Sequence, residues 1–563
     1  MTDVFEQMIG AAGRVGKALS GQTRHSPLAG EVLADPRLWL AGEPRLDAVA
    51  AADDALHGGA LAKTVSRLAP QERQRVAAAA TLAGPVEVML ALGGDDRAVP
   101  VGGRNSYGMP LADAAPVLRA SSCTATPPDG DALAAALRWR DRRLTEVRST
   151  ETVDVSTVRA DLVTRLSDLL GLGDGWSDRL ILSPSGTDVE SLLTVLSAGT
   201  GREQVRVVTV GAREAGSGTV LAAGLRSFRG TTPYAVGLTA GEPLAGGDPE
   251  AVEVVDVDLR DARGRVRRSS DVQAEVEAHV EWAVEQGARP LVHVMAGSKT
   301  GLIRLDPAWV RSWTSRVPQL RVVVDAAQLR LPRQQLADYL RAGSSAFVTG
   351  SKALGGPPFC GALLPAADLW ADAVALADDG SGLHPQLVHS VSAADLPPRL
   401  RALTRGLEPV NLGLLARWEV ALTEWERLAA LGSPLRREVT GSLVAGWRRG
   451  VGDLAGVQVA PERSDTVTTI VSFLVAGQDG WMDKGELGEI YARVTAAPGV
   501  YLGQPVEIVA GRSGVLRLAV GAPTVTRLVA RAEELGGLTE AVQECVGVAV
   551  DRIAGALPAT VHR

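Results

Sequence analysis

The stretch that decides the fold is AFVTGSKALGGPPFCGALL, residues 346–364. It opens with a short apolar run of the kind that forms a buried strand. The run ends at Thr349-Gly350, Ser351 and Lys352 follow, and a Gly/Pro turn leads into a second apolar run. This order predicts two strands joined by a tight turn, with Lys352 at a sheet edge where its side chain can enter a cleft. A solvated loop lysine, the usual place of this residue type, is the alternative.

The same pattern of short apolar runs continues on both sides of this stretch. Short β-branched runs alternate with amphipathic helical segments, and the runs are RLILSPS, VRVVTVG, VEVVDVDL, LVHVMAG, RVVVDAA, AFVTG and CGALLP. Such runs predict an α/β fold with a mostly parallel seven-stranded sheet that is buried on both faces. Residues 1–130 are instead Ala-rich with helical periodicity. We therefore expect a helical N-terminal extension followed by a large domain over residues 131–410.

The sequence pattern changes again after residue 410. A long helical segment at 412–431 leads into the strand runs TTIVSFLVA and VLRLAVGA, with helical segments between them. This pattern predicts a small α+β domain over residues 411–563.

Composition excludes several functional classes. The 563 residues are 46% hydrophobic and 22% charged, and Lys plus Arg (58) falls short of Asp plus Glu (65), which disfavours nucleic acid as a partner. The three cysteines show no CxxC spacing, so we expect neither a disulfide framework nor a metal site. The start does not resemble a signal peptide, and Gly84-Pro85 and Glu87 interrupt the most apolar stretch. We expect a soluble, cytoplasmic protein with no membrane partner.

Ser185-Gly186-Thr187 forms a candidate phosphate site. It follows the run RLILSP directly and precedes the helical segment DVESLLTVLSAG. A small turn that opens a helix presents unpaired N–H groups and the positive end of the helix dipole, which suits an anion. An ordinary helix cap is the alternative, since Ser and Thr are common in that position.

Asp325 lies at the end of the run RVVVDAA, and Gln328 follows three residues later. A carboxylate at the carboxyl edge of a buried parallel strand is costly unless a cation accompanies it. A cap for the following helix is the alternative. Asp325 precedes Lys352 by 352 − 325 = 27 residues, which is room for one helix and one strand. Both side chains are then expected at the same sheet edge, where α/β folds bind ligands.

With these motifs in place, the chain resembles the class V aminotransferase branch of the fold-type I pyridoxal-phosphate (PLP) enzymes, which have the aspartate-aminotransferase-like fold. The resemblance spans residues 120–530, and its carriers are SPSGTDVE, HVMAGSKTGL, VVVDAAQ, TGSKALGGPPFCGALL and VLRLAVGA. It implies that pyridoxal 5'-phosphate is the cofactor and that Lys352 holds it as an imine.

The resemblance also assigns the other cofactor contacts. It implies that Asp325 pairs with the pyridine nitrogen and Gln328 touches the ring oxygen. The residues it places around the phosphate are Ser185, Gly186, Thr187, Thr349 and Ser351. In this family the turn after the lysine often reaches the neighbouring subunit's cofactor, so Gly355 and Gly356 imply a homodimer with shared active sites.

Three residues are candidates for substrate binding. Arg517, in VLRLAVGA, matches the arginine that commonly grips the substrate α-carboxylate in this family, and a strand arginine in a salt bridge is the alternative. Residues 104–128 resemble the segment that crosses the cleft in related enzymes. Asn105 and Tyr107 within it are candidates for substrate contact, with an ordinary Gly/Pro loop as the alternative.

The chain departs from the family pattern at the face of the cofactor ring. Family members usually place a His or another aromatic ring there, but no histidine lies between Thr187 and Ala278. By position, Glu214 or Ala215 would replace it. Glu214 is then either a specialised acid/base group in the cofactor site or a residue of a Gly-rich turn. His293 lies within a strand run and is expected to be a core residue.

The cysteines do not match those of cysteine desulfurases, which need a nucleophilic thiol in a late loop. Cys360 and Cys545 lie in apolar segments, and only Cys123 lies in a polar one.

The expected activity is that of a homodimeric PLP enzyme that acts on an amino acid or another primary amine. Transamination is the first expectation, elimination or replacement by a lyase the second, and decarboxylation the third. A non-catalytic binding or scaffold protein that keeps the fold is an alternative from a different class. Frequent Ala, Arg, Gly and Val suggest a bacterium with a GC-rich genome. The substrate itself is not predicted.

Overall fold

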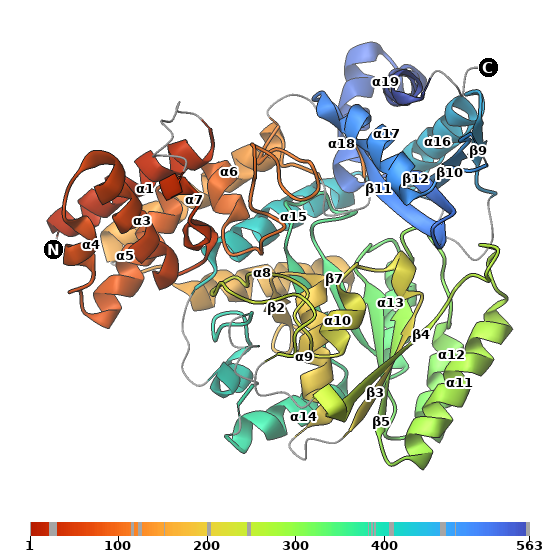
Figure 1. Cartoon of the computed structure of the whole chain (residues 1–563), viewed down its shortest axis with the longest axis horizontal. Helices are drawn as coiled ribbons and strands as arrows, with labels where there is room; N and C mark the ends of the chain where they lie inside the picture. The colour runs from red at the N-terminus through yellow and green to blue at the C-terminus, as the bar shows by residue number, and fades with distance from the viewer. Residues whose placement is uncertain are drawn as a thin grey trace.

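The computed structural model shows how these segments are arranged (Figure 1). The structure describes residues 2–21, 31–113, 118–121, 126–150, 152–199, 204–244, 249–380, 382–383, 387, 390–404, 410–461, 469–478 and 480–558. The N-terminal helices gather at one end of the molecule, while the seven-stranded sheet and a smaller sheet occupy the other.

The larger sheet consists of the seven expected strands. They are β2 (Ile181–Ser183), β3 (Val205–Val210), β4 (Val252–Val257), β5 (Arg289–Met295), β6 (Arg321–Ala326), β7 (Ser345–Thr349) and β8 (Gly361–Leu364). Their order is β2-β8-β7-β6-β5-β3-β4. The five strands from β7 to β4 are parallel, and β8 is antiparallel to both of its neighbours. The predicted mostly parallel sheet is confirmed.

Alternation along the strands divides the sheet into two buried faces. Val207, Leu291, Val323 and Phe347 pack with α9 (Gly186–Ala198) and α14 (Ala367–Asp378). The intervening valines pack on the other face, and the helices there are α8 (Val155–Leu170), α11 (Ser269–Glu285), α12 (Pro307–Arg316) and α13 (Arg333–Arg341). Side chains two residues apart on a strand point to the same face of the sheet. The residues two positions after Val207, Leu291, Val323 and Phe347 therefore lie on the α9 side, at the carboxyl edge of the sheet. They are Thr209, His293, Asp325 and Thr349.

A smaller sheet forms most of the C-terminal part. Its strands are β9 (Val457–Val459), β10 (Ile470–Val475), β11 (Val500–Val509), β12 (Ser513–Ala519) and β1 (Leu118–Ala120), in the order β1-β11-β12-β10-β9. Four helices accompany it: α16 (Ser433–Gly452), α17 (Lys484–Ala496), α18 (Ala522–Leu535) and α19 (Leu538–Ala556). The predicted α+β character is confirmed. β1 pairs in parallel with β11, so the N-terminal part also contributes to this sheet. The domain limits at 130 and 410 stay a prediction.

The N-terminal part is helical, as expected. Its elements are α1 (Thr2–Leu19), α3 (Glu43–His57), α4 (Leu61–Val65), α5 (Pro70–Leu82), α6 (Val86–Ala91) and α7 (Gly130–Thr150). The helix α15 (Leu412–Ala430) packs against α6 and α7 and also against α8 and α18 (Figure 1). It therefore connects the helical end of the molecule with both sheets.

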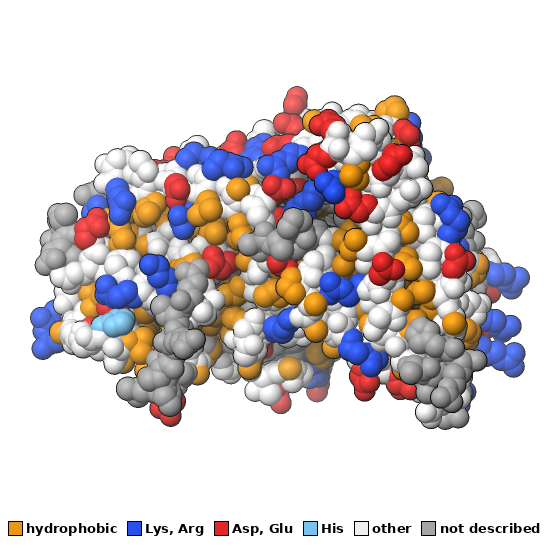
Figure 2. Space-filling view, turned by 90° about the horizontal axis from the view of Figure 1, so that it is seen from above, with side chains coloured by type: hydrophobic (Ala, Val, Ile, Leu, Met, Phe, Trp, Pro, Cys, Tyr) orange, Lys and Arg blue, Asp and Glu red, His pale blue; other side chains and the backbone are white. Residues whose placement is uncertain are grey.

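The surface carries both signs of charge. Figure 2 shows Lys and Arg side chains interspersed with Asp and Glu over the face seen from above. Among the described residues, no helix is both long enough and apolar enough to cross a membrane.

Candidate active site

A cavity lies at the carboxyl edge of β6 and β7, on the side of the sheet that α9 covers. We call it the edge cavity. It brings together nine of the predicted site residues: Tyr107, Ser185, Gly186, Thr187, Asp325, Gln328, Thr349, Ser351 and Lys352. These residues come from four separate segments of the chain, and the parallel strands that end here account for their convergence.

The phosphate-site candidate is the N-terminus of α9. Ser185 is the N-cap: its Oγ accepts a hydrogen bond from the Asp188 backbone N–H at 3.1 Å and donates one to the Asp188 carboxylate at 2.6 Å. The cap reading of Ser185 is therefore confirmed. Gly361 explains how β8 approaches this turn, because a Cβ there would lie 2.8 Å from the Ser185 carbonyl carbon. The Gly186 and Thr187 positions line the edge cavity at the positive end of the helix.

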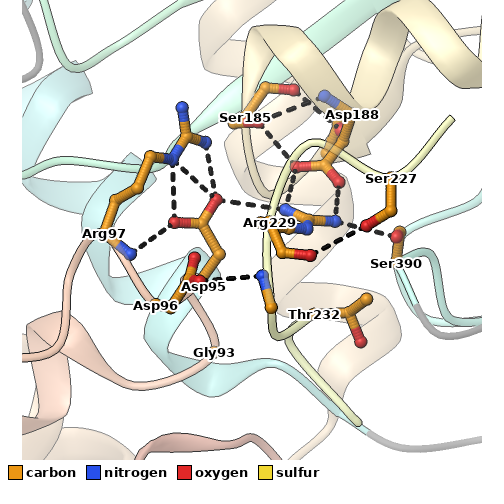
Figure 3. A network of polar contacts seen from close by, with 12 residues as sticks. Gly93, Asp95, Asp96, Arg97, Ser185, Asp188, Ser227, Arg229, Thr232 and Ser390 are labelled. Carbon is orange, nitrogen blue, oxygen red and sulfur yellow. Dashed lines mark hydrogen bonds and ion pairs between the residues drawn. The ribbon is translucent and has the colours of Figure 1, made fainter. Parts of the chain in front are cut away.

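A buried charge network supports this turn (Figure 3). Asp188, in the first turn of α9, would repel an anion, but Arg229 pairs with both of its carboxylate oxygens. Arg229 also donates to Asp95 at 3.2 Å and to the Ser390 hydroxyl at 2.9 Å. Asp95 in turn holds Arg97 through bonds of 2.9 and 2.5 Å. The negative charges of the two carboxylates are balanced by the positive charges of the two guanidiniums, so the turn at the N-terminus of α9 can keep its affinity for an anion.

Burial opposes the charged forms in this network, yet the pairing outweighs it. The pKa of Asp95 is lowered, because Arg97 and Arg229 overcome the effect of burial. The pKa of Arg229 is raised by Asp188 and Asp95, again against burial. Asp95 and Arg229 are thus expected to be ionised at neutral pH.

Asp325 and Gln328 lie where β6 ends. The Asp325 Oδ1 accepts a hydrogen bond from the Ala327 N–H at 2.9 Å, which fixes the carboxylate within its own turn. The buried Gln328 Oε1 has no hydrogen-bond partner among the described residues. A buried polar atom without a partner is costly, so this atom fits a site for a ligand with a hydroxyl or other donor.

The turn that carries Lys352 packs tightly on its surroundings. The Thr349 hydroxyl donates to the Ala327 carbonyl at 2.8 Å and so ties the end of β7 to the end of β6. Gly350 and Gly356 are pressed against Ala421 of α15, where a Cβ on either would come within 2.6 Å. Lys352 itself is half-buried and lines the edge cavity. Its predicted position on a sheet-edge turn is confirmed.

Gly355 and Gly356 do not line the edge cavity of this chain. Both are buried, and Gly355 has a φ of +72° with Pro523 directly beside it. Its carbonyl accepts a hydrogen bond from Arg119. Their role in a partner subunit's active site stays a prediction.

Glu214 is placed differently from the expectation that it replaces a ring on the cofactor. It does not line the edge cavity and instead pairs with Arg260 at 2.6 Å, while the Ser298 hydroxyl donates to it at 2.6 Å and Thr300 also donates. Burial acts against ionisation, but Arg260 and the two hydroxyls hold the pKa of Glu214 below its usual range. Gly211, at φ +79°, begins the turn that directs Glu214 toward Arg260. Gly216 and Ser217 line the edge cavity from this loop.

His293 and Glu190 form a pair that the sequence did not reveal as part of the site. His293 Nδ1 lies 2.6 Å from Glu190 Oε2, and both side chains are buried. His293 is thus the core residue that was expected, yet its partner Glu190 lines the edge cavity. Burial raises the pKa of Glu190, and Asp325 adds to this while His293 and Lys352 oppose it. The two carboxylates of Glu190 and Asp325 are therefore electrostatically coupled.

Arg517 lies beside the edge cavity, in the wall of a second and larger cavity. It is fully buried, and its guanidinium donates to the Lys299 carbonyl at 2.8 Å and to the Gln504 carbonyl at 2.9 Å. Tyr107 lines both cavities. Asn105 lines neither, because its Oδ1 accepts from the N–H groups of Tyr107 and Met109 and closes the local turn. The loop reading of Asn105 is the one that the structure supports.

Further lining residues were not found from the sequence. They are Arg97, Glu190, Ser217, Lys299, Phe347 and Gln504. Lys299 stands within HVMAGSKTGL, one of the segments that carry the resemblance, so it could have been singled out. Arg97 had no such signal, because a long-range fold contact brings it here. Cys360 and Cys545 line neither cavity, and burial raises the pKa of each thiol to about 12. Cys123 lies outside the described residues.

Comparison with known proteins finds neighbours only among solved structures. No protein-family model matches the chain, and no curated protein sequence matches it. The apo cysteine desulfurase of Thermococcus onnurineus NA1 is 14% identical with a TM-score of 0.48, and the match covers 78% of this chain and 95% of that one.

Two aminotransferase structures show the same level of similarity. Phosphoserine aminotransferase SerC of Cytophaga hutchinsonii ATCC 33406 is 12% identical with a TM-score of 0.46, covering 74% of this chain and 98% of that one. Pyridoxamine-pyruvate aminotransferase of Mesorhizobium loti is 16% identical with a TM-score of 0.45, covering 79% and 97%. Identities this low do not carry an activity from one protein to another. The order and direction of the seven strands confirm the predicted α/β fold with a mostly parallel sheet.

Proposed function

We propose that this protein is a PLP-dependent enzyme that acts on an amino acid or another primary amine, and that its reaction is transamination. One observation carries the proposal: a single cavity at the carboxyl edge of the sheet holds Lys352, Asp325, Gln328 and the N-terminus of α9. An amine, a carboxylate, an unpartnered amide oxygen and an anion site are the four groups that the aldehyde, ring nitrogen, ring hydroxyl and phosphate of PLP require.

Each residue has a defined task in this proposal. The backbone N–H groups of Gly186 and Thr187 bind the phosphate. The Asp325 carboxylate holds a proton on the ring nitrogen, and Gln328 Oε1 accepts from the ring hydroxyl. Lys352 would hold the aldehyde end of the cofactor through its Nζ. PLP, when bound, supplies an electron sink for the bond that breaks at the substrate Cα.

The chain also has to orient the substrate and move a proton. Arg517 is buried and fixed by two backbone carbonyls, so its guanidinium suits a bidentate contact with the α-carboxylate. Lys352, whose amine lines the edge cavity, is the group that would carry a proton to or from the substrate Cα. Phe347, buried in the cavity wall, excludes water on the α9 side.

The cofactor assignment is tested by absorbance. We expect purified protein supplied with PLP to show a visible band that borohydride abolishes, with the reduced cofactor found by mass spectrometry on the Lys352 peptide. Lys352→Ala should lose the band and at least about 10³-fold of the activity, because both the covalent link and the proton carrier are gone. Lys63→Ala, an exposed lysine of α4, is the control. A wild-type protein that stays colourless contradicts the proposal.

The reaction is tested by its products. Transfer of the substrate amino group to an added 2-oxo acid supports transamination. Release of ammonium with a keto acid, in the absence of an acceptor, would replace transamination by elimination, and release of carbon dioxide would replace it by decarboxylation. A coloured protein that gives none of these products with a panel of amino acids and amines would favour a non-catalytic PLP-binding protein.

A further inference from the structure

A second cavity adjoins the edge cavity and opens toward the C-terminal sheet. We call it the outer chamber. Its volume is about 670 Å³, and it shares Arg97, Tyr107, Ser217, Lys299 and Gln504 with the edge cavity. This volume is within the range of sites for small ligands, so the chamber offers much more room than an α-carboxylate needs.

The walls of the outer chamber are cationic. Five basic side chains line it: Arg97, Arg104, Lys299, Lys484 and Arg517. No Asp or Glu among the described residues lines it. Arg97 is neutralised by Asp95, and Arg517 suits the α-carboxylate. An excess of positive charge remains in the outer chamber, which Lys352 does not line.

Three of these cations, Arg104, Lys484 and Arg517, line the outer chamber and not the edge cavity, and two of the three make no described ion pair. Arg104 donates to the carbonyls of Gly108, Thr495 and Ala496, and no described carboxylate lies within ion-pair distance of it. Lys484, the first residue of α17, is exposed, and no hydrogen bond or ion pair joins its ammonium to another described residue. Neither lines the edge cavity. Their charges are therefore available to a group that projects outward from the reacting carbon.

From this arrangement we infer that the substrate is an acidic amino acid, whose second anionic group, a carboxylate or a phosphate, binds between Arg104 and Lys484 in the outer chamber. The inference rests on the proposed function, since the amino group must reach Lys352. It adds the substrate class: Arg517, which lies beside the edge cavity, binds the α-carboxylate, and Arg104 and Lys484 bind the second anion. Ammonium and guanidinium groups in a common wall suit either anion.

The test compares acidic donors with neutral donors of similar shape. Glutamate is compared with glutamine and phosphoserine with serine, by kcat/KM and by calorimetric binding to the cofactor-free protein. At least one acidic member is expected to be preferred about tenfold or more, because it engages both outer cations. In Lys484→Gln the ratio of acidic to neutral kcat/KM should fall about fivefold, and the preference should weaken at high salt. Lys63→Gln is the matched control, because Lys63 is also an exposed lysine and is distant from Lys484 in the sequence.

The outcomes separate this inference from the proposed function. A coloured, active enzyme that prefers neutral donors, or a Lys484→Gln protein with an unchanged ratio, overturns the acidic-substrate inference and leaves the PLP assignment intact. A colourless protein overturns the proposed function, and calorimetry then still reports whether the outer chamber binds phosphoserine or glutamate. If phosphoserine binds and glutamate does not, the second anion is a phosphate.

Discussion

The edge cavity and the outer chamber share a wall, but they are built in different ways. Every charged group behind the edge cavity has a partner of opposite charge or a hydrogen bond: Asp188 with Arg229, Asp95 with Arg97, Glu190 with His293. The outer chamber has an excess of cations, and two of them make no described ion pair. Charged groups that are paired hold the residues of a site in one arrangement, whereas cations without a counter-charge can attract an anionic ligand.

This difference predicts how each region responds to mutation. Groups of the edge cavity and of the network behind it are buried or half-buried and interact with one another, so one change there disturbs several partners. Arg104 and Lys484 of the outer chamber are exposed, so a change in either alters the selection of the substrate and little else.

The largest effect is expected at Asp325. Asp325→Asn removes the carboxylate that is proposed to keep the ring nitrogen protonated, and we expect activity to fall about 10³-fold, equivalent to ~4 kcal/mol, the cost of separating a buried charge pair. The visible band should persist, because Lys352 is intact. Asp256→Asn is the matched control, since this exposed aspartate also lies at the end of a parallel strand but lines no part of the edge cavity. Equal activity losses in the two variants would contradict the assigned role of Asp325.

The next effect is expected in the network behind the phosphate turn. Arg229→Met leaves Asp188 and Asp95 buried without their shared partner, so the free energy of unfolding should fall by ~3 kcal/mol. The affinity for PLP should fall as well, because an uncompensated Asp188 then lies at the anion site. Chemical denaturation and a cofactor titration measure the two quantities.

Arg226→Met is the control for this prediction. Arg226 stands three residues earlier in the same loop, is exposed, and donates to the Gly241 carbonyl. If Arg229→Met destabilises the protein no more than Arg226→Met does, the network does not hold the turn.

The contrast between the two regions also explains what the sequence could predict. All seven strands of the large sheet and nine of the residues that line the edge cavity were found, and most of the nine belong to a short motif at a strand end: the 185–187 turn, Asp325 with Gln328, and Lys352 on its Gly/Pro turn. Parallel strands place such motifs at one edge whatever their separation in sequence. Local signals were therefore sufficient for the inner site.

For the outer chamber the sequence singled out Arg517 and Tyr107 but gave no signal for Arg104 or Lys484. The cations of this chamber come from a loop of the N-terminal part, the 298–300 turn, the start of α17 and the middle of β12. Only the packing of the small sheet against the large one brings them together. The strand β11 was also missed, because Gly503 and Pro505 interrupt its run, and the register shifts between Gly503 and Val506. The prediction that Glu214 lies at the cofactor ring was wrong, because it rested on the position of Glu214 along the chain and did not include the turn that begins at Gly211.

The last and smallest effect concerns the pH dependence of stability at the floor of the edge cavity. Burial raises the pKa of Glu190, next to His293, Asp325 and Lys352, so the folded protein binds this proton more tightly than the unfolded chain. The stabilisation is fully present below the ordinary carboxyl pKa of 4.5 and is lost as pH rises through the raised value. Glu190→Gln mimics the neutral acid and lacks this dependence. Denaturation of the cofactor-free proteins from about pH 4 to about pH 8 should thus show wild type losing stability relative to Glu190→Gln as pH rises. The opposite slope would mean that Glu190 is ionised against a charged His293, and the floor of the edge cavity would then hold an ion pair in place of a neutral acid.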